Sequence, residues 1–142
     1  MENIKSLDTL SFESLFIAFN KAFSDYEIQV NSKELRVMLS RRGFVPSLSF
    51  GLFEEDKLIA FTLNGIGEFN GEKTAYDTGT GTLKEYRGRG LATALLAEAL
   101  KYNRHHAVKM VNTEISCKNI TAFMNSCGIP LKGTQFEMIK KW

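Results

Sequence analysis

The most informative run in the 142-residue chain reads Tyr86-Arg87-Gly88-Arg89-Gly90-Leu91-Ala92-Thr93. Glycines let a turn expose successive backbone amides, and the residues after Gly90 begin a strongly helical pattern. The first amides of a helix have no partner within it and form the positive end of the helix dipole. The run therefore predicts an anion site suited to a diphosphate, with Arg87 and Arg89 as counter-charges. The alternative is an exposed turn with two solvated arginines.

Helices are predicted on both sides of this run. Residues 91–102 have Ala and Leu at most positions, and both are strong helix formers. Nearer the N-terminus, residues 11–23 and about 32–42 show helical spacing of apolar side chains, with Ser11 as a cap of the first and Gly43 ending the second. The predicted inward positions of these two helices are Phe12, Leu15, Phe16, Phe19 and Phe23, and then Leu35, Met38 and Leu39.

The middle of the chain has the pattern of an antiparallel meander. Residues 48–53 and 58–63 read as strands joined by a turn at 54–57. Asn70-Gly71 predicts a type I′ hairpin turn, because both central positions need a positive φ. A third strand over about 73–83 should therefore pair antiparallel with residues 58–69. Its repeated glycines indicate either a bend or bulge, or a place where something approaches the backbone closely.

The C-terminal third completes the predicted architecture. Residues 108–115 alternate like a strand, residues 119–127 read as a short helix that ends at Gly128, and residues 134–139 read as a last strand. The whole order predicts an α+β fold, in which a mixed sheet is flanked by helices.

Length and composition predict one domain over residues 1–142. Eighteen basic residues against sixteen acidic ones leave +2, which gives no electrostatic argument for a nucleic-acid partner. Two cysteines and two adjacent histidines do not suggest a disulfide framework or a metal site. The chain has neither a leader-like start nor roughly 18 uninterrupted apolar residues, so we expect a cytoplasmic protein with no membrane partner. A homodimer is left open.

The run at 86–93 matches neither G-x-x-x-x-G-K-[ST] nor a Rossmann G-x-G-x-x-G. Instead, Arg87-x-x-Gly90-x-Ala92, placed after a strand and opening a long helix, resembles the acetyl-CoA signature of the GNAT superfamily of N-acetyltransferases. Residues 113–122, where a strand ends before Asn119-x-x-Ala122, are similar to the family's second segment, and the order of elements also agrees. The resemblance implies a single GNAT-like domain of three layers, whose mostly antiparallel sheet is splayed at the cofactor site.

The resemblance also implies roles for particular residues. Acetyl-CoA would be the co-substrate, and the acceptor would be a small-molecule or peptide amine. The pantetheine arm would bond like an added strand to the main chain near Thr80 and Thr82, and Asn119 would hold it from the other side. A backbone N–H near Thr82 or Leu83 would polarise the thioester carbonyl. The pyrophosphate would lie at Arg87 and on the amides of Gly88, Arg89, Gly90, Leu91, Ala92 and Thr93.

The proton transfers are less defined. Family members commonly carry a Tyr acid on the helix after the Asn, but residues 119–128 contain no Tyr. Glu114 matches the base position of some members, with an ordinary strand-end residue as the alternative, and Asp25, Tyr26 and Asp77 are weaker candidates. Tyr26 lies in the interhelix segment that often borders the acceptor pocket in this family. Without the Tyr, a non-catalytic CoA-binding or sensing module stays open, and so does another kind of phosphate-binding domain if the turn is a coincidence.

Overall fold

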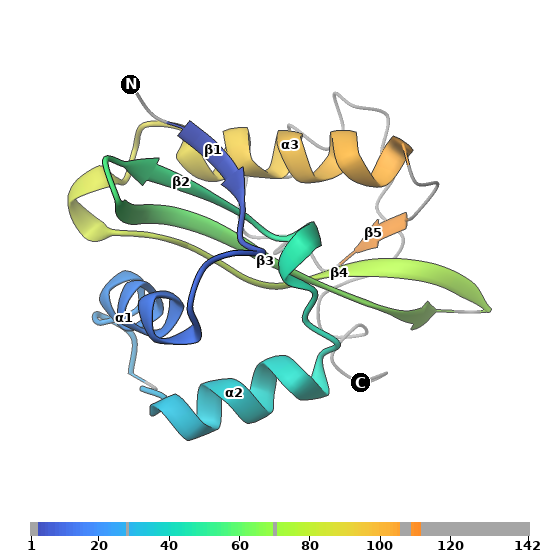
Figure 1. Ribbon diagram of the computed structural model, residues 1–142, viewed down its shortest axis with the longest axis horizontal. Coiled ribbons are helices and arrows are strands. Elements are labelled where there is room, and N and C mark those ends of the chain that lie inside the picture. Colours follow the sequence, from blue (N-terminus) through green and yellow to red (C-terminus); the bar gives the residue numbers. More distant parts are fainter. Residues whose placement is uncertain (1–2, 28, 70, 106–108, 112–142) are drawn as a thin grey trace.

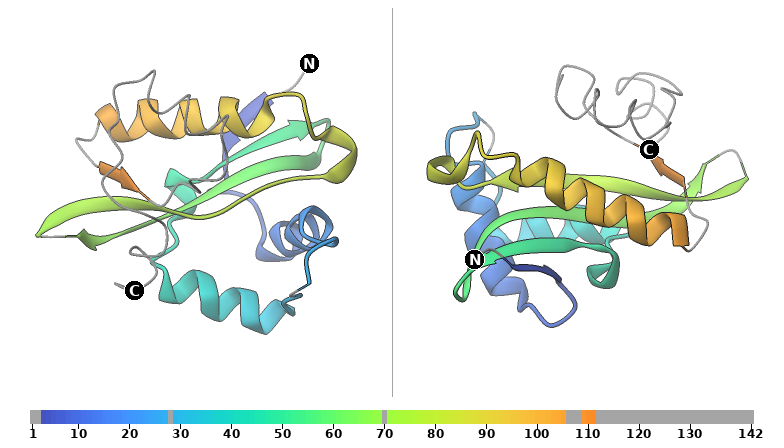
Figure 2. Two further views of the ribbon diagram at one scale, coloured as in Figure 1. Left: turned by 180° about the vertical axis from the view of Figure 1, so that it is seen from behind. Right: turned by 90° about the horizontal axis from the view of Figure 1, so that it is seen from above.

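The computed structural model describes residues 3–27, 29–69, 71–105 and 109–111. Its elements are β1 (Asn3–Ser6), α1 (Phe12–Ala22), α2 (Ser32–Arg41), the short turn η1 (Pro46–Leu48), β2 (Phe50–Glu54), β3 (Lys57–Phe69), β4 (Glu72–Thr82), the short turn η2 (Lys84–Tyr86), α3 (Leu91–His105) and β5 (Lys109–Val111). One sheet of order β1-β2-β3-β4-β5 separates α3 from α1 and α2 (Figure 1). The two turned views show the same three layers (Figure 2). Because β1 to β4 pair antiparallel and β5 pairs parallel with β4, the predicted α+β fold with a mixed sheet is confirmed.

The helices α1 and α2, which lie on the same face of the sheet, begin and end where capping chemistry predicts. Ser11 Oγ accepts from Ser14 N–H at 3.1 Å, which satisfies one of the unpaired first-turn amides of α1. Asn31 and Glu34 bond reciprocally and form a capping box that starts α2. Gly43 has a φ of +69°, a conformation that suits glycine just beyond a helix end.

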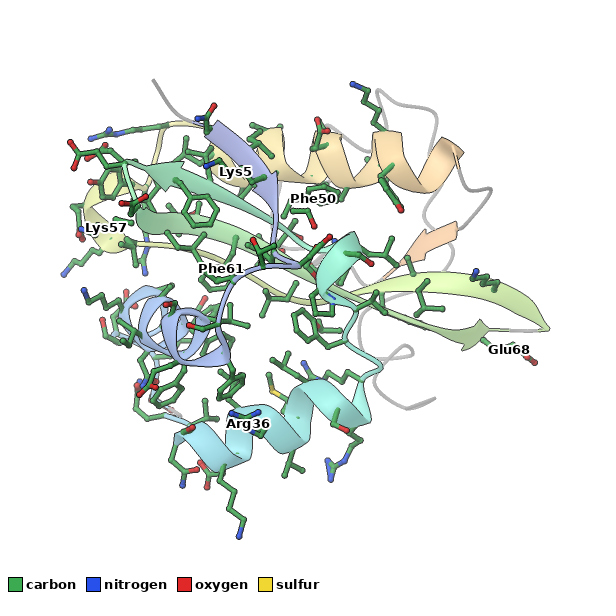
Figure 3. The ribbon with its side chains drawn as sticks, viewed as in Figure 1. Lys5, Arg36, Phe50, Lys57, Phe61 and Glu68 are labelled. Atoms are coloured by element: carbon green, nitrogen blue, oxygen red, sulfur yellow. The ribbon has the colours of Figure 1, made fainter. Side chains whose placement is uncertain are left out.

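The predicted hairpin is the longest pairing in the sheet. Phe69 pairs with Glu72 and Gly71 has a φ of +77°, so the connection falls at Asn70-Gly71 as predicted. Its two strands, β3 and β4, extend beyond the other strands, and Glu68 lies near the tip (Figure 3). The pairing shifts register between Leu63 and Asn64, where β4 accommodates an extra residue.

The two faces of the sheet pack against different aromatic side chains. Phe61 is fully buried towards α1, where its ring centroid lies 6.0 Å from Phe19 and 6.2 Å from Phe23. Phe50 faces the other way, 6.1 Å from the ring of Tyr102 on α3, and the two phenylalanines lie on opposite sides of the sheet in Figure 3. The aromatic stripe of α1 is therefore part of the core, as its spacing predicts.

The glycines of β4 now have a structural explanation. A Cβ built on Gly81 would lie 2.7 Å from Phe61 Cζ and 3.0 Å from Ala22 Cβ, whereas one on Gly79 would meet Phe19 at an ordinary 3.6 Å. The group that approaches this part of the backbone closely is the core itself. Gly81 gives α1 the room to pack directly on β4.

Several elements differ from the sequence prediction. Strand β2 begins at Phe50 and not at residue 48, because Pro46–Leu48 forms a tight turn in which Ser49 N–H donates to Pro46 O. The edge strand β1 was not predicted, since four residues are too few for a periodic pattern. Strand β5 confirms part of the predicted strand 108–115. The predicted helix 119–127 and strand 134–139 lie outside the described residues.

Gly81→Ala should lower the free energy of unfolding by about 1–3 kcal/mol, because its methyl group would overlap Phe61 in a closely packed core. Gly79→Ala is the matched control, and its effect should stay within about 0.5 kcal/mol. Urea denaturation of the two variants measures both values. Equal stabilities would contradict the packing role given to Gly81.

Candidate functional site

The turn that opens α3 has the backbone geometry of an anion site. Gly88 and Gly90 have φ values of +80° and +75°, and a Cβ on either glycine would meet no atom within 4 Å. Ala94 N–H donates to Gly90 O at 3.0 Å, so the amides of residues 91–93 precede the hydrogen-bond ladder of the helix. The turn therefore presents backbone N–H groups beside open space, which suits a phosphate.

Beside this turn, one edge of β4 extends past the described part of its partner strand β5. β4 and β5 pair only from Thr74 to Tyr76, and no strand among the described residues pairs with residues 77–82 on that side. Leu83 N–H donates to Ile59 O at 2.9 Å, and hydrogen-bonded pairs alternate along an antiparallel ladder. The N–H and C=O groups of Thr80 and Thr82 therefore point away from β3. Because the Leu83 amide is used within the sheet, Thr82 is the better of the two predicted oxyanion donors.

Arg87 does not extend freely into solvent. Its Nη1 and Nη2 donate to the two carboxylate oxygens of Asp25 at 2.9 and 3.2 Å. Nη2 also donates to Ala22 O at 2.7 Å, and Nε donates to Thr82 O at 3.2 Å. The hydrogen bonds that Arg87 donates to the Asp25 carboxylate are the main reason that the pKa of Asp25 is lowered to about 2. A carboxylate with so low a pKa is a weak base near neutral pH, which argues against Asp25 as the proton acceptor.

The other predicted counter-charge, Arg89, is exposed. Its guanidinium lies over the Tyr86 ring, 5.1 Å from the centroid, and its Nη2 makes one long hydrogen bond of 3.4 Å to Glu85 O. Arg89 is therefore the arginine of this turn better placed to meet an added anion.

Asp77 forms a polar cluster at the point where β4 leaves β5. It is half-buried and accepts from Gly79 N–H at 2.9 Å and from Thr80 Oγ1 at 2.8 Å. Burial raises its pKa to about 6, against the lowering effects of these two hydrogen bonds and of the Arg42 charge. Arg42 itself donates to Thr78 O at 3.0 Å. A carboxyl group that titrates close to neutral pH beside the open strand edge is a candidate for proton transfer.

The remaining predicted residues fall into two groups. Tyr26 lies on the segment after α1, is 59% exposed, and packs edge-on against Phe23 with centroids 4.9 Å apart. It therefore lies one residue from Asp25, near the start of the turn at Arg87. Glu114 and Asn119 lie outside the described residues, so their predicted roles stay predictions.

The described part of the chain contains neither a metal-binding cluster nor a membrane-spanning helix. No three His, Cys, Asp or Glu side chains there are grouped so that they could hold a metal ion. None of the described helices combines the length and the apolar character needed to cross a membrane.

Comparisons with known proteins agree with the fold. The model of the acetyltransferase (GNAT) family matches residues 12–128. A search of curated proteins found no match. Similar solved structures include a predicted acetyltransferase with acetyl-CoA from Clostridium acetobutylicum, with 17% identity, a TM-score of 0.66, and 96% of this chain and 98% of that chain covered. Another is the ribosomal-protein-S18-alanine N-acetyltransferase from Escherichia coli, with 19% identity, a TM-score of 0.65, and 90% and 77% covered.

A third similar structure is AAC(6')-Iy in complex with the bisubstrate analogue CoA-S-monomethyl-acetylneamine, with 15% identity, a TM-score of 0.65, and 94% of this chain and 93% of that chain covered. Likeness at these identities shows the three-layer fold. The family model covers well over half of the chain, so the chain belongs to the GNAT family of acetyltransferases.

The cluster at Asp77 predicts a pH-dependent stability. An ordinary carboxyl pKa of 3.8 rises to about 6 on folding, so the native state binds the proton more tightly than the unfolded state. Stability should therefore fall as the pH rises from about 4 to about 6, by up to about 3 kcal/mol.

Asp77→Asn removes this titration, and its amide can still bond to Gly79 N–H and Thr80 Oγ1. The variant should gain stability relative to the native chain between pH 4 and pH 8. Urea unfolding at several pH values measures the difference. A constant difference across this range would show that Asp77 keeps an ordinary pKa.

Proposed function

We propose that the protein transfers an acetyl group from acetyl-CoA to a primary amine, by direct attack of the amine in a ternary complex. One observation carries the proposal: in a chain of the GNAT family, the glycine turn that opens α3 lies beside the outward-facing edge of β4. The turn suits the phosphates and the edge suits the extended pantetheine arm, so one ligand could use both. The similar structures with acetyl-CoA or a CoA bisubstrate analogue support the same choice of co-substrate.

The backbone supplies most of the proposed cofactor contacts. The amides of residues 88–93 would bind the pyrophosphate, with Arg89 as the nearest exposed cation. Thr80 and Thr82 would bond to the pantetheine arm as an edge strand bonds to a neighbour. Asn119, with its amide donor and acceptor, would hold the arm from the opposite side.

The chemistry needs a polarised carbonyl and a free amine. Acetyl-CoA supplies a thioester whose C–S bond breaks as the amine nitrogen bonds to the carbonyl carbon. Thr82 N–H, which points away from β3, would donate to the carbonyl oxygen as negative charge develops there. A thiol has a pKa near 8.5, so the departing thiolate needs little protonation and the missing Tyr need not prevent turnover. The amine proton would pass to Glu114, directly or through a water, with Asp77 as the described alternative.

The acceptor class follows from this chemistry. The proposal takes a primary amine on a small molecule or a peptide as the acceptor. Two of the similar proteins span this range: one is a ribosomal-protein-S18-alanine N-acetyltransferase, and the other is in complex with the bisubstrate analogue CoA-S-monomethyl-acetylneamine. Tyr26, exposed at the segment after α1, is the proposed acceptor contact.

Acetyl-CoA should raise the melting temperature, while ATP and NAD should not, because a ligand of the native state stabilises it by RT ln(1 + [L]/Kd). Gly90→Asp should weaken acetyl-CoA binding at least about ten-fold relative to Gly90→Asn, a difference of about 1.4 kcal/mol. Asn has the same shape and tolerates the same positive φ, so only the added charge differs between the two variants. Equal affinities of the two variants for acetyl-CoA would show that the phosphates do not bind at this turn.

Release of free CoA thiol with a panel of amines separates an enzyme from the second candidate function, a non-catalytic CoA-binding module. That candidate is favoured by the absence of Tyr from residues 119–128. A binder without turnover would give the melting shift and no thiol.

Where thiol is released, Glu114→Gln should lower kcat/KM at pH 7 by about 10²–10⁴-fold, because it cannot take the proton of an ammonium group with a pKa near 10. The loss should shrink as the pH rises and free amine becomes abundant. Glu68→Gln, at the exposed tip of the hairpin, is the matched control. Native rates at every pH would exclude Glu114 and leave Asp77 as the candidate base.

A further inference from the structure

The guanidinium of Arg87 joins two parts of the chain that are distant in the sequence, the end of α1 with the segment after it, and the end of β4 with the turn that opens α3. It donates to Ala22 O at the end of α1, to Asp25 in the following segment, and to Thr82 O at the end of β4. The Asp25 contact spans 62 positions of the chain. Arg87 is also the residue at which the turn opening α3 begins, so its side chain ties this turn to the segment after α1, residues 23–27.

The Arg87–Asp25 ion pair contributes little to the free energy of unfolding. The side chains of Arg87 and Asp25 are 39% and 43% exposed, and ion pairs at such exposed sites contribute little to folding. They do have directional character, because a planar guanidinium that meets a carboxylate with two parallel bonds fixes an orientation as well as a distance. A contact that adds little stability but has a fixed geometry is suited to coupling the position of the turn to that of the segment 23–27.

From this geometry we infer that Arg87 and Asp25 form a positioning link, which transmits the binding of CoA at the turn to the segment 23–27. The inference rests on the proposed function, since it needs the turn to bind CoA. It also gives the motif arginine a role different from that of a phosphate ligand. In this role Arg87 is a positioning residue that acts through Asp25.

The physical basis is the loss of conformational freedom on binding. In the free protein, an exposed pair is a weak restraint and would hold Asp25 to Arg87 only part of the time. The bonds of Gln29 Nε2 to Phe23 O and Tyr26 O hold the segment 23–27 together but do not tie it to the turn. When phosphates order the amides after Arg87, less freedom remains to be lost on forming the pair, and the pair is populated more. Because coupling is reciprocal, order in the segment would in turn favour CoA binding.

The segment that would be ordered carries the proposed acceptor contact. Tyr26 follows Asp25 directly, and its ring rests on Phe23, which packs on Phe61 in the core. Fixing Asp25 therefore limits where the Tyr26 side chain can lie. The link would prepare the acceptor side of the site once the co-substrate is in place.

A phosphate ligand role for Arg87 makes the opposite prediction. Its nitrogens already donate to Asp25, Ala22 O and Thr82 O, so a phosphate could recruit the guanidinium only by breaking some of these bonds. Binding would then release Asp25 and loosen the segment. The two roles are distinguished by whether CoA binding orders or loosens the segment 23–27.

Hydrogen exchange followed by mass spectrometry, with and without saturating CoA, measures directly whether the segment becomes more or less ordered. In the native chain, CoA should slow exchange in residues 87–94 and also, by about two- to five-fold, in residues 22–27. Arg87→Lys keeps the charge but loses the planar fork, and Asp25→Asn keeps the shape but loses the charge. Both variants should keep the protection of 87–94 and lose that of 22–27.

The matched control is Glu85→Gln, which breaks the exposed Lys57–Glu85 pair of 3.7 Å beside the same turn. It should behave like the native chain. Asp25→Asn leaves the bonds of Arg87 to Ala22 O and Thr82 O available, so it tests the link even where Arg87→Lys does not fold.

Each outcome decides between the roles. Faster exchange in 22–27 on CoA binding overturns the link and makes Arg87 a phosphate ligand. Protection of 22–27 that survives in both variants also overturns it. Protection of 87–94 alone in the native chain rejects the link and leaves the proposed function standing, whereas no protection of 87–94 rejects both.

Discussion

The packing of α1 on Phe61 positions the segment after α1 against the turn that opens α3. The rings of Phe19 and Phe23 lie against Phe61, and Gly81 leaves the space that lets α1 approach β4. The end of α1 is thereby held beside the end of β4, within reach of Arg87. A core contact between one ring and one glycine thus sets the distance between the acceptor-side segment and the turn.

The described part of the proposed site offers a ligand mainly backbone groups. The turn offers amides held by two glycines with positive φ, and β4 offers the outward N–H groups of Thr80 and Thr82. Backbone groups stay in place through most substitutions, so such a site depends on conformation more than on residue identity.

The sequence predicts the features that are set by local chemistry. The N-cap of α1, the hairpin at Gly71, and the glycine turn before α3 each follow from residues a few positions apart, and the structure contains all three. The Arg87–Asp25 pair could not be predicted, because no local pattern relates residues 62 positions apart. The raised pKa of Asp77 could not be predicted either, since it depends on burial that only the folded sheet creates. The use of the Leu83 amide depends on strand register for the same reason.

Residues 77–82 of β4 have no partner on their outer edge among the described strands, and such an edge has a cost that its surroundings reduce. A bare strand edge is a template on which a second chain can add, which leads to aggregation. Here the edge is interrupted by an extra residue near Thr78, and the carbonyls of Thr78 and Thr82 already accept from Arg42 and Arg87. These features blunt the edge against another protein strand, while the amides of Thr80 and Thr82 still face outward. The same stretch can therefore stay open to a narrow, extended ligand without inviting edge-to-edge association of the protein with itself.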